Sequence, residues 1–236
     1  TYPLVCTRGV VLYPNQEIVI DVGRDTSVHA VENAQDNYDK KICLFSQKEL
    51  EQENPGKEDI YSVGTLCEVR HIRRFDNFLR VKFRGIKRVK LNNWINGSLS
   101  DLAEVEILES EKQDAVEEEA LIRMIADELD RMQGQDRFVT KEIVMEISKG
   151  MGGEFLSDKA VQGLPLDIER KQQYLETLGV NDRLMMLLQD MAKEKKMSEV
   201  EQQINETVKE RIDQGQKDYY LREKMNVIRE ELGDTV

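Results

Sequence analysis

Residues 79–84 run Leu-Arg-Val-Lys-Phe-Arg, an unbroken alternation of apolar and basic side chains. Successive side chains of a β-strand point to opposite faces, so this stretch predicts a strand with one buried face and one solvated, basic face. Similar β-rich runs lie on both sides of it, and proline, glycine or polar turns separate them. The predicted strands are 10–13, 17–22, 41–45, 64–72, 78–84, 87–91 and 103–108.

Two segments of this half differ from the strands. Residues 25–37 carry their apolar side chains at helical intervals, which predicts one short helix. Residues 47–59 are polar and contain an Asn-Pro-Gly sequence, so we expect a surface loop there. Short, mainly antiparallel strands with a single helix predict an α+β fold, with a small β-barrel or sandwich domain over residues 1–109.

The sequence changes character near residue 110. Residues 1–109 have a net charge of −2, whereas the rest of the chain carries the remaining −10 of the total −12 and all nine methionines. Apolar residues there recur at helical spacing, and Gly134 is expected to end the first helix. The predicted helices are 121–132, 138–149, 155–162 and 167–178, which together suggest a small helical bundle over residues 110–179.

The last segment, residues 180–236, predicts one long helix. Between residues 180 and 232 there is no proline and one glycine, Gly215. A glycine costs roughly 1 kcal/mol in a helix interior relative to alanine, so we expect a bend or hinge at Gly215. At ~1.5 Å per residue the helix would be about 80 Å long and would project from the domain. Its narrow apolar stripe is typical of a coiled-coil seam and consists of Met197, Val200, Ile204, Val208, Ile212, Leu221, Met225, Ile228 and Leu232.

The residues that could carry chemistry point away from catalysis. Cys67 and His71 lie four residues apart on a predicted strand, about 13 Å, whereas a nucleophile and its base need roughly 3 Å. We expect both side chains to belong to the core. With two histidines in the chain, a His/Cys metal site is not expected. No phosphate-binding loop, dinucleotide fingerprint or nucleophile elbow occurs, so we expect no cofactor and no hydrolysis of ATP or protein by this chain.

The longest apolar run, residues 184–188, is far shorter than the roughly 20 residues of a membrane-spanning helix, so no membrane span is expected. Three cysteines without a C-x-x-C spacing favour the reducing cytoplasm over secretion.

Residues 70–90 are strongly basic, with nine Lys and Arg against one acid, and three phenylalanines lie among them. Such a composition raises nucleic-acid binding as an alternative function. The alternation in this segment instead points the aromatic rings inward and the charges into water, which favours a solvated strand face. Ion pairing with the acidic half of a neighbouring subunit is a further alternative.

Residues 216–225, Gln-Lys-Asp-Tyr-Tyr-Leu-Arg-Glu-Lys-Met, and the continuing residues 228–233 closely resemble the helix that precedes the ATPase module of Lon, the ATP-dependent protease. The resemblance covers essentially the whole chain. Its other elements, in the expected order, are Arg8-Gly9-Val10-Val11-Leu12-Tyr13-Pro14, Val22-Gly23-Arg24 with Ser27, Val63-Gly64-Thr65, Gly85 with Arg88, Leu164-Pro165-Leu166, and Arg183-Leu184.

The resemblance implies several things that composition does not. Lon-like proteins are homohexameric rings that unfold and degrade damaged or regulatory proteins, with an ATP- and magnesium-dependent AAA+ motor and a Ser–Lys protease after the amino-terminal region. By this resemblance the chain is the amino-terminal region alone, a PUA-like β-domain followed by a helical domain. The implied function is substrate recognition and support of the oligomer, with unfolded or damaged proteins as partners and without a cofactor in this region.

Exposed apolar side chains suit such a function, because shallow patches and flexible methionines accept many apolar partners. We expect unfolded clients to contact one of two patches: the loop tip Leu12, Tyr13 and Pro14, or the methionines Met185, Met186, Met191 and Met197. The alternative for all seven is that they are core residues. The alternatives for the region as a whole are a nucleic-acid-binding module that uses residues 70–90 and a structural spacer.

Overall fold

The structure is a computed structural model that describes residues 1–98, 100–132 and 141–231, so Gly134, Phe138 and Leu232 lie outside the described residues. Contacts divide the chain into two compact units, Thr1–Leu188 and Gln189–Val236. The divisions expected after residues 109 and 179 stay predictions.

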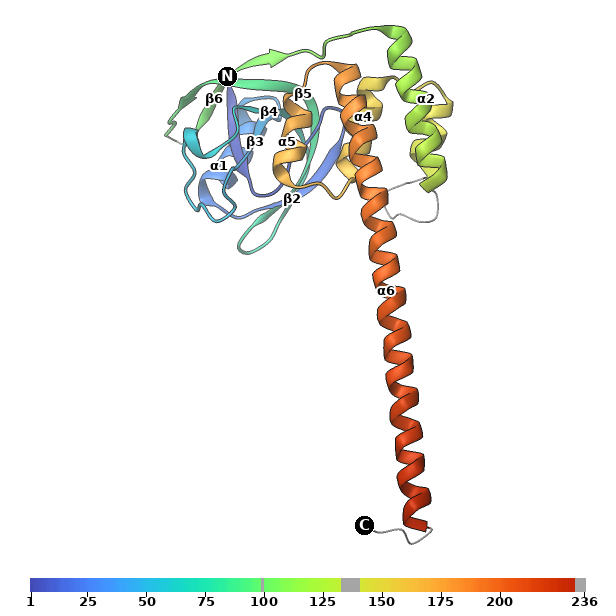
Figure 1. The fold of residues 1–236 in the computed structure, drawn as a ribbon. Coiled ribbons are helices and arrows are strands. Elements are labelled where there is room, and N and C mark those ends of the chain that lie inside the picture. The colour runs from blue at the N-terminus through green and yellow to red at the C-terminus, as the bar shows by residue number, and fades with distance from the viewer. Residues whose placement is uncertain (99, 133–140, 232–236) are drawn as a thin grey trace. The chain divides into compact units, whose positions relative to one another are not determined.

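Six strands form one curved sheet in the first unit (Figure 1). Their order is β2-β5-β4-β3-β1-β6, and β6 also pairs with β5. Only the β1–β3 pair is parallel among the described ladders. The sheet is sandwich-like rather than a true barrel, which confirms the α+β, mainly antiparallel prediction. The strands are β1 (Tyr2–Thr7), β2 (Glu17–Val22), β3 (Lys41–Ser46), β4 (Val63–Arg74), β5 (Leu79–Ile95) and β6 (Leu102–Leu108).

The prediction of a strand over residues 10–13 is wrong. The true first strand is β1, and residues 10–13 belong to no strand. Hydroxyl groups take the place of a strand partner there, because Thr7 and Ser46 donate to the Val10 carbonyl at 2.7 and 2.6 Å, and Thr65 donates to the Leu12 carbonyl at 2.5 Å. The strand over 17–22 and the helix over 25–37, which is α1 (Asp25–Asn37), are confirmed.

β5 runs without interruption through Gly85, where the sequence predicted a break between two strands. A Cβ atom at residue 85 would lie 2.1 Å from the Tyr13 carbonyl oxygen, so glycine is required by close backbone approach and not by a turn. The Gly85 amide donates to the Gln16 carbonyl at 2.9 Å, and the Asn15 amide donates to the Gly85 carbonyl at 2.9 Å. The segment before β2 is thereby fixed against β5.

Two apolar clusters occupy the interior of the β-rich part. One contains the buried face of α1 (Ala30, Val31 and Ala34) against side chains of the strands. The other contains Phe45 and Val89, with Ile60 from the segment between β3 and β4. That segment, which includes the predicted loop 47–59, holds one short 3₁₀ helix, Lys57–Asp59.

Helices follow β6, as the sequence predicted. They are α2 (Ala115–Met132), α3 (Lys141–Ser148), α4 (Gly153–Gly163), α5 (Ile168–Glu176) and α6 (Val180–Glu231). Asp167 caps α5 by accepting from the Arg170 amide at 2.7 Å. The amide of Gln172 on α5 donates to the Val63 carbonyl at 2.8 Å, so α5 is joined directly to β4.

α6 is a single helix of 52 residues that continues through Gly215. The helix is therefore not broken at this glycine, and a hinge at Gly215 stays a prediction. A Cβ at Gly215 would meet nothing within 4 Å, so the glycine makes no close contact of its own. From Glu199 to Glu231 every residue of α6 is exposed. None of the helices in the described part of the chain combines the length and apolarity that crossing a bilayer would require.

Candidate functional site

The loop tip proposed for client capture is buried. Leu12 is 3% and Tyr13 0% exposed, and Pro14 is also buried. The Tyr13 hydroxyl donates to the Lys171 carbonyl of α5 at 2.7 Å, and burial raises its pKa well above the ordinary value. The exposure that we expected next to a strand-ending proline is absent because α5 covers this segment. These three residues are core, the alternative that the sequence left open.

The four methionines proposed for client capture differ in exposure. Met191 is buried at 1% exposure, and Met186 is half-buried beside the Thr177 hydroxyl. Met185, in the first unit, and Met197, in the second, are 42% and 49% exposed. Only Met185 and Met197 therefore present the apolar surface that the hypothesis needs.

Cys67 and His71 do not form a catalytic pair. Cys67 is fully buried, its thiol donates to the Thr65 carbonyl at 3.2 Å, and burial raises its pKa well above the ordinary value. His71 is exposed, contrary to the prediction that it faces the core. A register shift in the β4–β5 ladder between Val69 and His71 reverses the alternation at that point.

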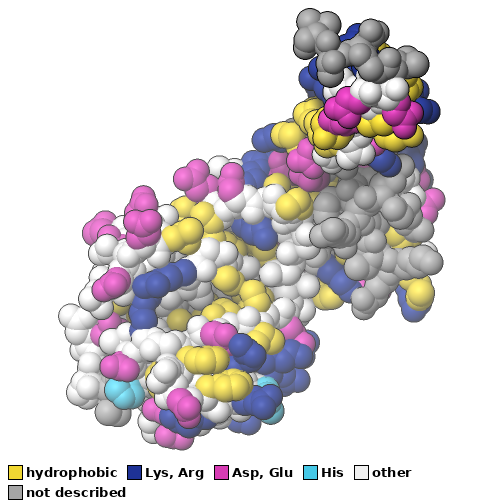
Figure 2. Space-filling view, turned by 90° about the horizontal axis from the view of Figure 1, so that it is seen from below, with side chains coloured by type: hydrophobic (Ala, Val, Ile, Leu, Met, Phe, Trp, Pro, Cys, Tyr) yellow, Lys and Arg dark blue, Asp and Glu magenta, His cyan; other side chains and the backbone are white. Residues whose placement is uncertain are grey.

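The basic residues 70–90 are largely paired within the chain. Leu79, Val81 and Phe83 are buried while Arg80 and Arg84 are exposed, which confirms the solvated strand face. The inward orientation predicted for the aromatic rings holds for Phe83 only, because Phe75 and Phe78 are half-buried and stack on each other with ring centroids 4.7 Å apart. Six of the nine Lys and Arg residues form ion pairs: Arg70–Glu68, Arg74–Glu32, Arg80–Asp21, Lys82–Glu17, Lys87–Glu109 and Arg88–Asp158. Figure 2 shows Lys and Arg side chains gathered on one face with Asp and Glu beside them. This pairing leaves little positive charge for a phosphate backbone.

One residue of this basic segment has a role that the sequence did not indicate. Arg88 is 2% exposed and makes two hydrogen bonds to the Asp158 carboxylate of α4, at 2.9 and 2.5 Å, and a third to the Leu175 carbonyl at 3.0 Å. Arg183 is also fully buried, 4.0 Å from the same carboxylate. Burial, and then the charge of Arg88, lowers the pKa of Arg183 to about 10. This cluster joins β5 to the helices and is structural.

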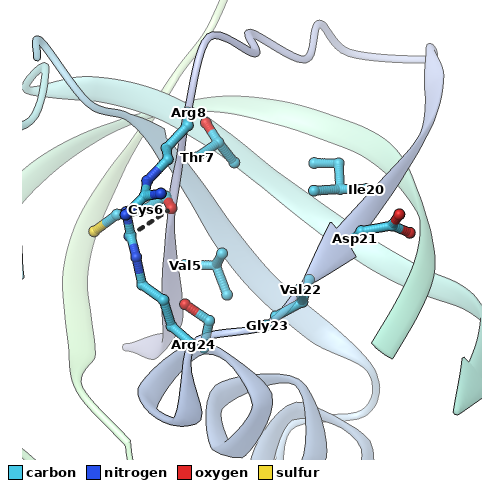
Figure 3. Close-up of a pocket in the computed structure, with 10 residues that line it drawn as sticks. Val5, Cys6, Thr7, Arg8, Ile20, Asp21, Val22, Gly23 and Arg24 are labelled. Carbon is cyan, nitrogen blue, oxygen red and sulfur yellow. Dashed lines mark hydrogen bonds between the residues drawn. The ribbon is translucent and has the colours of Figure 1, made fainter. Parts of the chain in front are cut away.

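A pocket of about 290 Å³ opens between β1, β2 and the start of α1 (Figure 3). No ladder joins β1 to β2 among the described residues, so their side chains form its two walls. Val5 and Val22 are buried and Ile20 is half-buried, which makes these walls apolar. Ser27, on the first turn of α1, also lines it.

Two arginines converge along one side of this pocket. Figure 3 shows the guanidinium groups of Arg8 and Arg24 approaching each other from opposite ends, while Asp21 points away from them. Arg24 donates to the Cys6 carbonyl at 3.4 Å, to the Gln47 side chain at 2.6 Å and to the Gln52 carbonyl at 3.2 Å. Arg8 donates to the same Gln52 carbonyl at 3.5 Å.

The electrostatics of this pair are those of an anion site. Burial, and secondly the positive charge of Arg8, lowers the pKa of Arg24. In the described part of the chain, neither guanidinium lies within 4.0 Å of a carboxylate. No group of three or more metal-ligating side chains occurs among the described residues. The arrangement can bind an anion. The Cys6 thiol also lines the pocket, but burial raises its pKa to about 12, so it stays protonated near neutral pH.

No pattern in the sequence identified this pocket as a site. Arg8, Arg24 and Ser27 were named only as elements of the family resemblance. Their positions are 16 and 3 residues apart, so no local periodicity indicates that they meet. The usable signal was an arginine next to a glycine at the edge of a predicted strand, as Arg8-Gly9 before residues 10–13 and Gly23-Arg24 after residues 17–22.

The family and the individual proteins that match this chain agree with each other. The family described as ATP-dependent protease La (LON) substrate-binding domain matches residues 1–193. The Lon protease of Brevibacillus choshinensis is 34% identical over 233 residues, and that of Escherichia coli (strain K12) is 31% identical, each match covering 98% of this chain. The chain spans about 30% of the length of these relatives.

Two solved structures share the fold. The N-terminal domain of Mycobacterium avium complex Lon protease superposes with a TM-score of 0.66 at 19% identity, covering 81% of this chain and 97% of that one. The Lon N-terminal domain protein from Xanthomonas campestris gives 0.55 at 16% identity, with coverages of 79% and 96%.

Proposed function

The chain belongs to the family of ATP-dependent protease La (LON) substrate-binding domains, and from this we propose that it captures unfolded or damaged proteins for a Lon-type ATP-dependent serine protease. The observation that carries the proposal is the family match over residues 1–193, together with relatives aligned over 98% of the chain. ATP, magnesium, the motor and the protease belong in this proposal to the whole protein.

Exposed apolar side chains support client capture. Met185 presents an unbranched, polarisable side chain on the first unit, and Met197 does so on the second. Burying one such side chain contributes about 1.5–3 kcal/mol, so a single patch binds weakly. Several copies acting on one client would raise the apparent affinity through avidity.

Self-association is the second part of the proposal. The apolar stripe of α6 between residues 197 and 228 is 42–56% exposed at each of its eight described positions. Apolar side chains that stay in water add little to the stability of a single helix. A coiled coil with other copies would bury them, consistent with a hexameric parent. A PUA-like β-domain and a cytoplasmic location complete the proposal.

Binding of a labelled unfolded protein to the 236-residue chain tests the proposal. Fluorescence anisotropy with labelled casein should give weak binding that changes little between low and high salt, because apolar contacts carry it. The variants Met185→Gln and Met197→Gln should weaken binding, while Met124→Gln, at an exposed methionine of α2, serves as the matched control.

Absence of casein binding would favour the structural spacer. Steep loss of binding with salt would favour a charged, nucleic-acid-like mode of recognition. Equal loss in the Met124→Gln control would show that exposed methionines act without positional preference.

A further inference from the structure

We propose that the pocket between β1, β2 and α1 binds a peptide carboxylate through Arg8 and Arg24, with an aliphatic side chain of the same peptide against Val5 and Ile20. The inference rests on the proposed function, because it names the feature of a protein client that the pocket recognises.

Neither arginine of the pocket has a counter-ion among the described residues. Arg80, on β5, is held by Asp21 at 2.7 and 2.8 Å, and five other basic side chains of residues 70–90 are likewise paired with carboxylates. Arg8 and Arg24 instead share a neutral acceptor, the Gln52 carbonyl, and no described carboxylate lies within 4.0 Å of either. The charge of Glu53 acts on Arg24 through space without such a contact. Two adjacent cations repel each other, and an anion between them would relieve that repulsion.

Arg8 has hydrogen-bond donors to spare. A guanidinium carries five N–H donors, and Arg8 makes one hydrogen bond among the described residues, at 3.5 Å. Arg24 uses its terminal nitrogens on three oxygens, which fixes the orientation of its side chain. The exposed Arg8 is therefore the group free to form a two-bond fork with a carboxylate, and Arg24 supplies a preoriented second charge.

The wall of the pocket opposite the arginines is apolar. Val5, Ile20 and Val22 offer an apolar surface that a phosphate chain would leave unfilled. The pocket, at about 290 Å³, lies just below the roughly 300–1,000 Å³ typical of small-ligand sites. It suits one or two residues of a peptide and not a large cofactor. Charge and shape together indicate a carboxylate beside an aliphatic side chain.

Three fluorescein-labelled peptides of equal length test the proposal by anisotropy with the 236-residue chain. One ends in Leu with a free carboxylate, one is amidated with an internal Glu-Leu pair, and one is amidated and has no acid. At least one acidic peptide should bind about tenfold or more tightly than the neutral one. Comparison of the two acidic peptides then shows whether the pocket prefers a terminal carboxylate or a Glu side chain.

Arg8→Gln should remove about tenfold of that affinity while circular dichroism shows an unchanged fold, because Arg8 is exposed. Arg84→Gln, at an exposed arginine of β5, is the matched control and should bind as the unmodified chain does. Ile20→Thr should reduce the preference for Leu over Gly beside the carboxylate, which tests the apolar wall separately.

Equal binding of the neutral peptide, or no effect of Arg8→Gln, would overturn the inference. So would binding of a single-stranded oligonucleotide that depends on Arg8 when neither acidic peptide binds. Casein with esterified carboxylates separates the two proposals. If it binds the unmodified chain while the acidic peptides do not, client capture stands and the pocket inference fails; if neither binds, both fail.

Discussion

Arg88 and Arg183, both fully buried, share one nearby carboxylate, that of Asp158. Taking charges out of water is costly, and the cost is offset only when every partner is present. Asp158 therefore determines whether the contact between β5 and the helices is stable. A buried ion pair is weak evidence of net stabilisation, but the loss of one partner from it is strongly destabilising.

Asp158→Asn should lower the free energy of unfolding by about 3–5 kcal/mol, because it leaves the buried Arg88 guanidinium without its paired carboxylate and removes one of the two carboxylates that act on Arg183. Urea denaturation measures this. Asp36→Asn, at an exposed carboxylate on α1, should change the same quantity by no more than about 0.5 kcal/mol. Equal stability of the two variants would contradict the structural role of the cluster.

The buried thiols make the free energy of unfolding depend on pH, and the direction of this dependence can be derived. Burial raises the pKa of Cys6 and of Cys43 to about 12. In the unfolded chain a thiol ionises near its ordinary value, so above that value the unfolded state loses protons first and is favoured. Stability is therefore fully present below about pH 9 and falls as the pH rises toward 12, by up to about 1.4 kcal/mol per pH unit for each thiol.

The unfolding midpoint should drop between pH 8 and pH 10.5, and by a smaller amount in the double variant Cys6→Ala/Cys43→Ala. Mass spectrometry after iodoacetamide treatment at pH 8 gives an independent check: Cys43 should be labelled in urea and protected in its absence. Labelling at equal rates in both conditions would show that the thiol is not held in the core.

At the scale of elements, α6 and β4 show how well a local sequence pattern predicts a helix or a strand. The apolar stripe and the absence of proline predicted one long helix from residue 180, and α6 is helical from Val180 to Glu231, the last residue described there. The glycine within it does not break the helix. In β4, one register shift is enough to turn His71 to the solvent although the sequence alternates. Neighbouring hydrogen bonds override a single unfavourable residue, whereas an extra residue in a ladder reverses every side chain after it.

Gly215→Ala should stabilise α6 by up to about 1 kcal/mol, because a Cβ meets nothing within 4 Å and alanine loses less backbone entropy. Hydrogen exchange in the unmodified chain should be fastest around residues 213–217 within α6, and it should slow there in the variant. Uniform exchange along the helix in both chains would rule out local opening at the glycine.

At the scale of the whole molecule, the distribution of charge and apolar surface governs association. The net charge of −12 opposes self-association at low salt, while the exposed stripe of α6 favours it. Salt screens the first effect and leaves the second. Association should therefore increase with ionic strength, the opposite of phosphate-backbone binding.

Sedimentation velocity at two salt concentrations measures this association. The double variant Ile204→Glu/Val208→Glu should shift the chain toward the monomer, since it places charges in the proposed seam. Gln202→Glu/Asn205→Glu adds the same charge at polar positions of the same helix and should have a smaller effect. Equal effects of the two would attribute the change to net charge and not to the seam.

The sequence by itself determined the elements whose signals are local. The bounds of β2 and α1, the change from strands to helices near residue 110, and the start of α6 all follow from periodicity and breakers within a few residues, whereas the continuity of α6 through Gly215 does not. The resemblance to Lon was also available, because residues 216–225 and the ordered matches before them are stretches of sequence.

The tertiary structure alone decided which side chains are buried and which charges are satisfied. Tyr13 is core because its hydroxyl meets Lys171, 158 residues later, and Arg88 is buried because Asp158 lies 70 residues further along the chain. Arg8 and Arg24 lie together because both donate to the Gln52 carbonyl. Burial and pairing depend on such distant partners, and a pattern that extends over one helical turn or one strand carries no information about them.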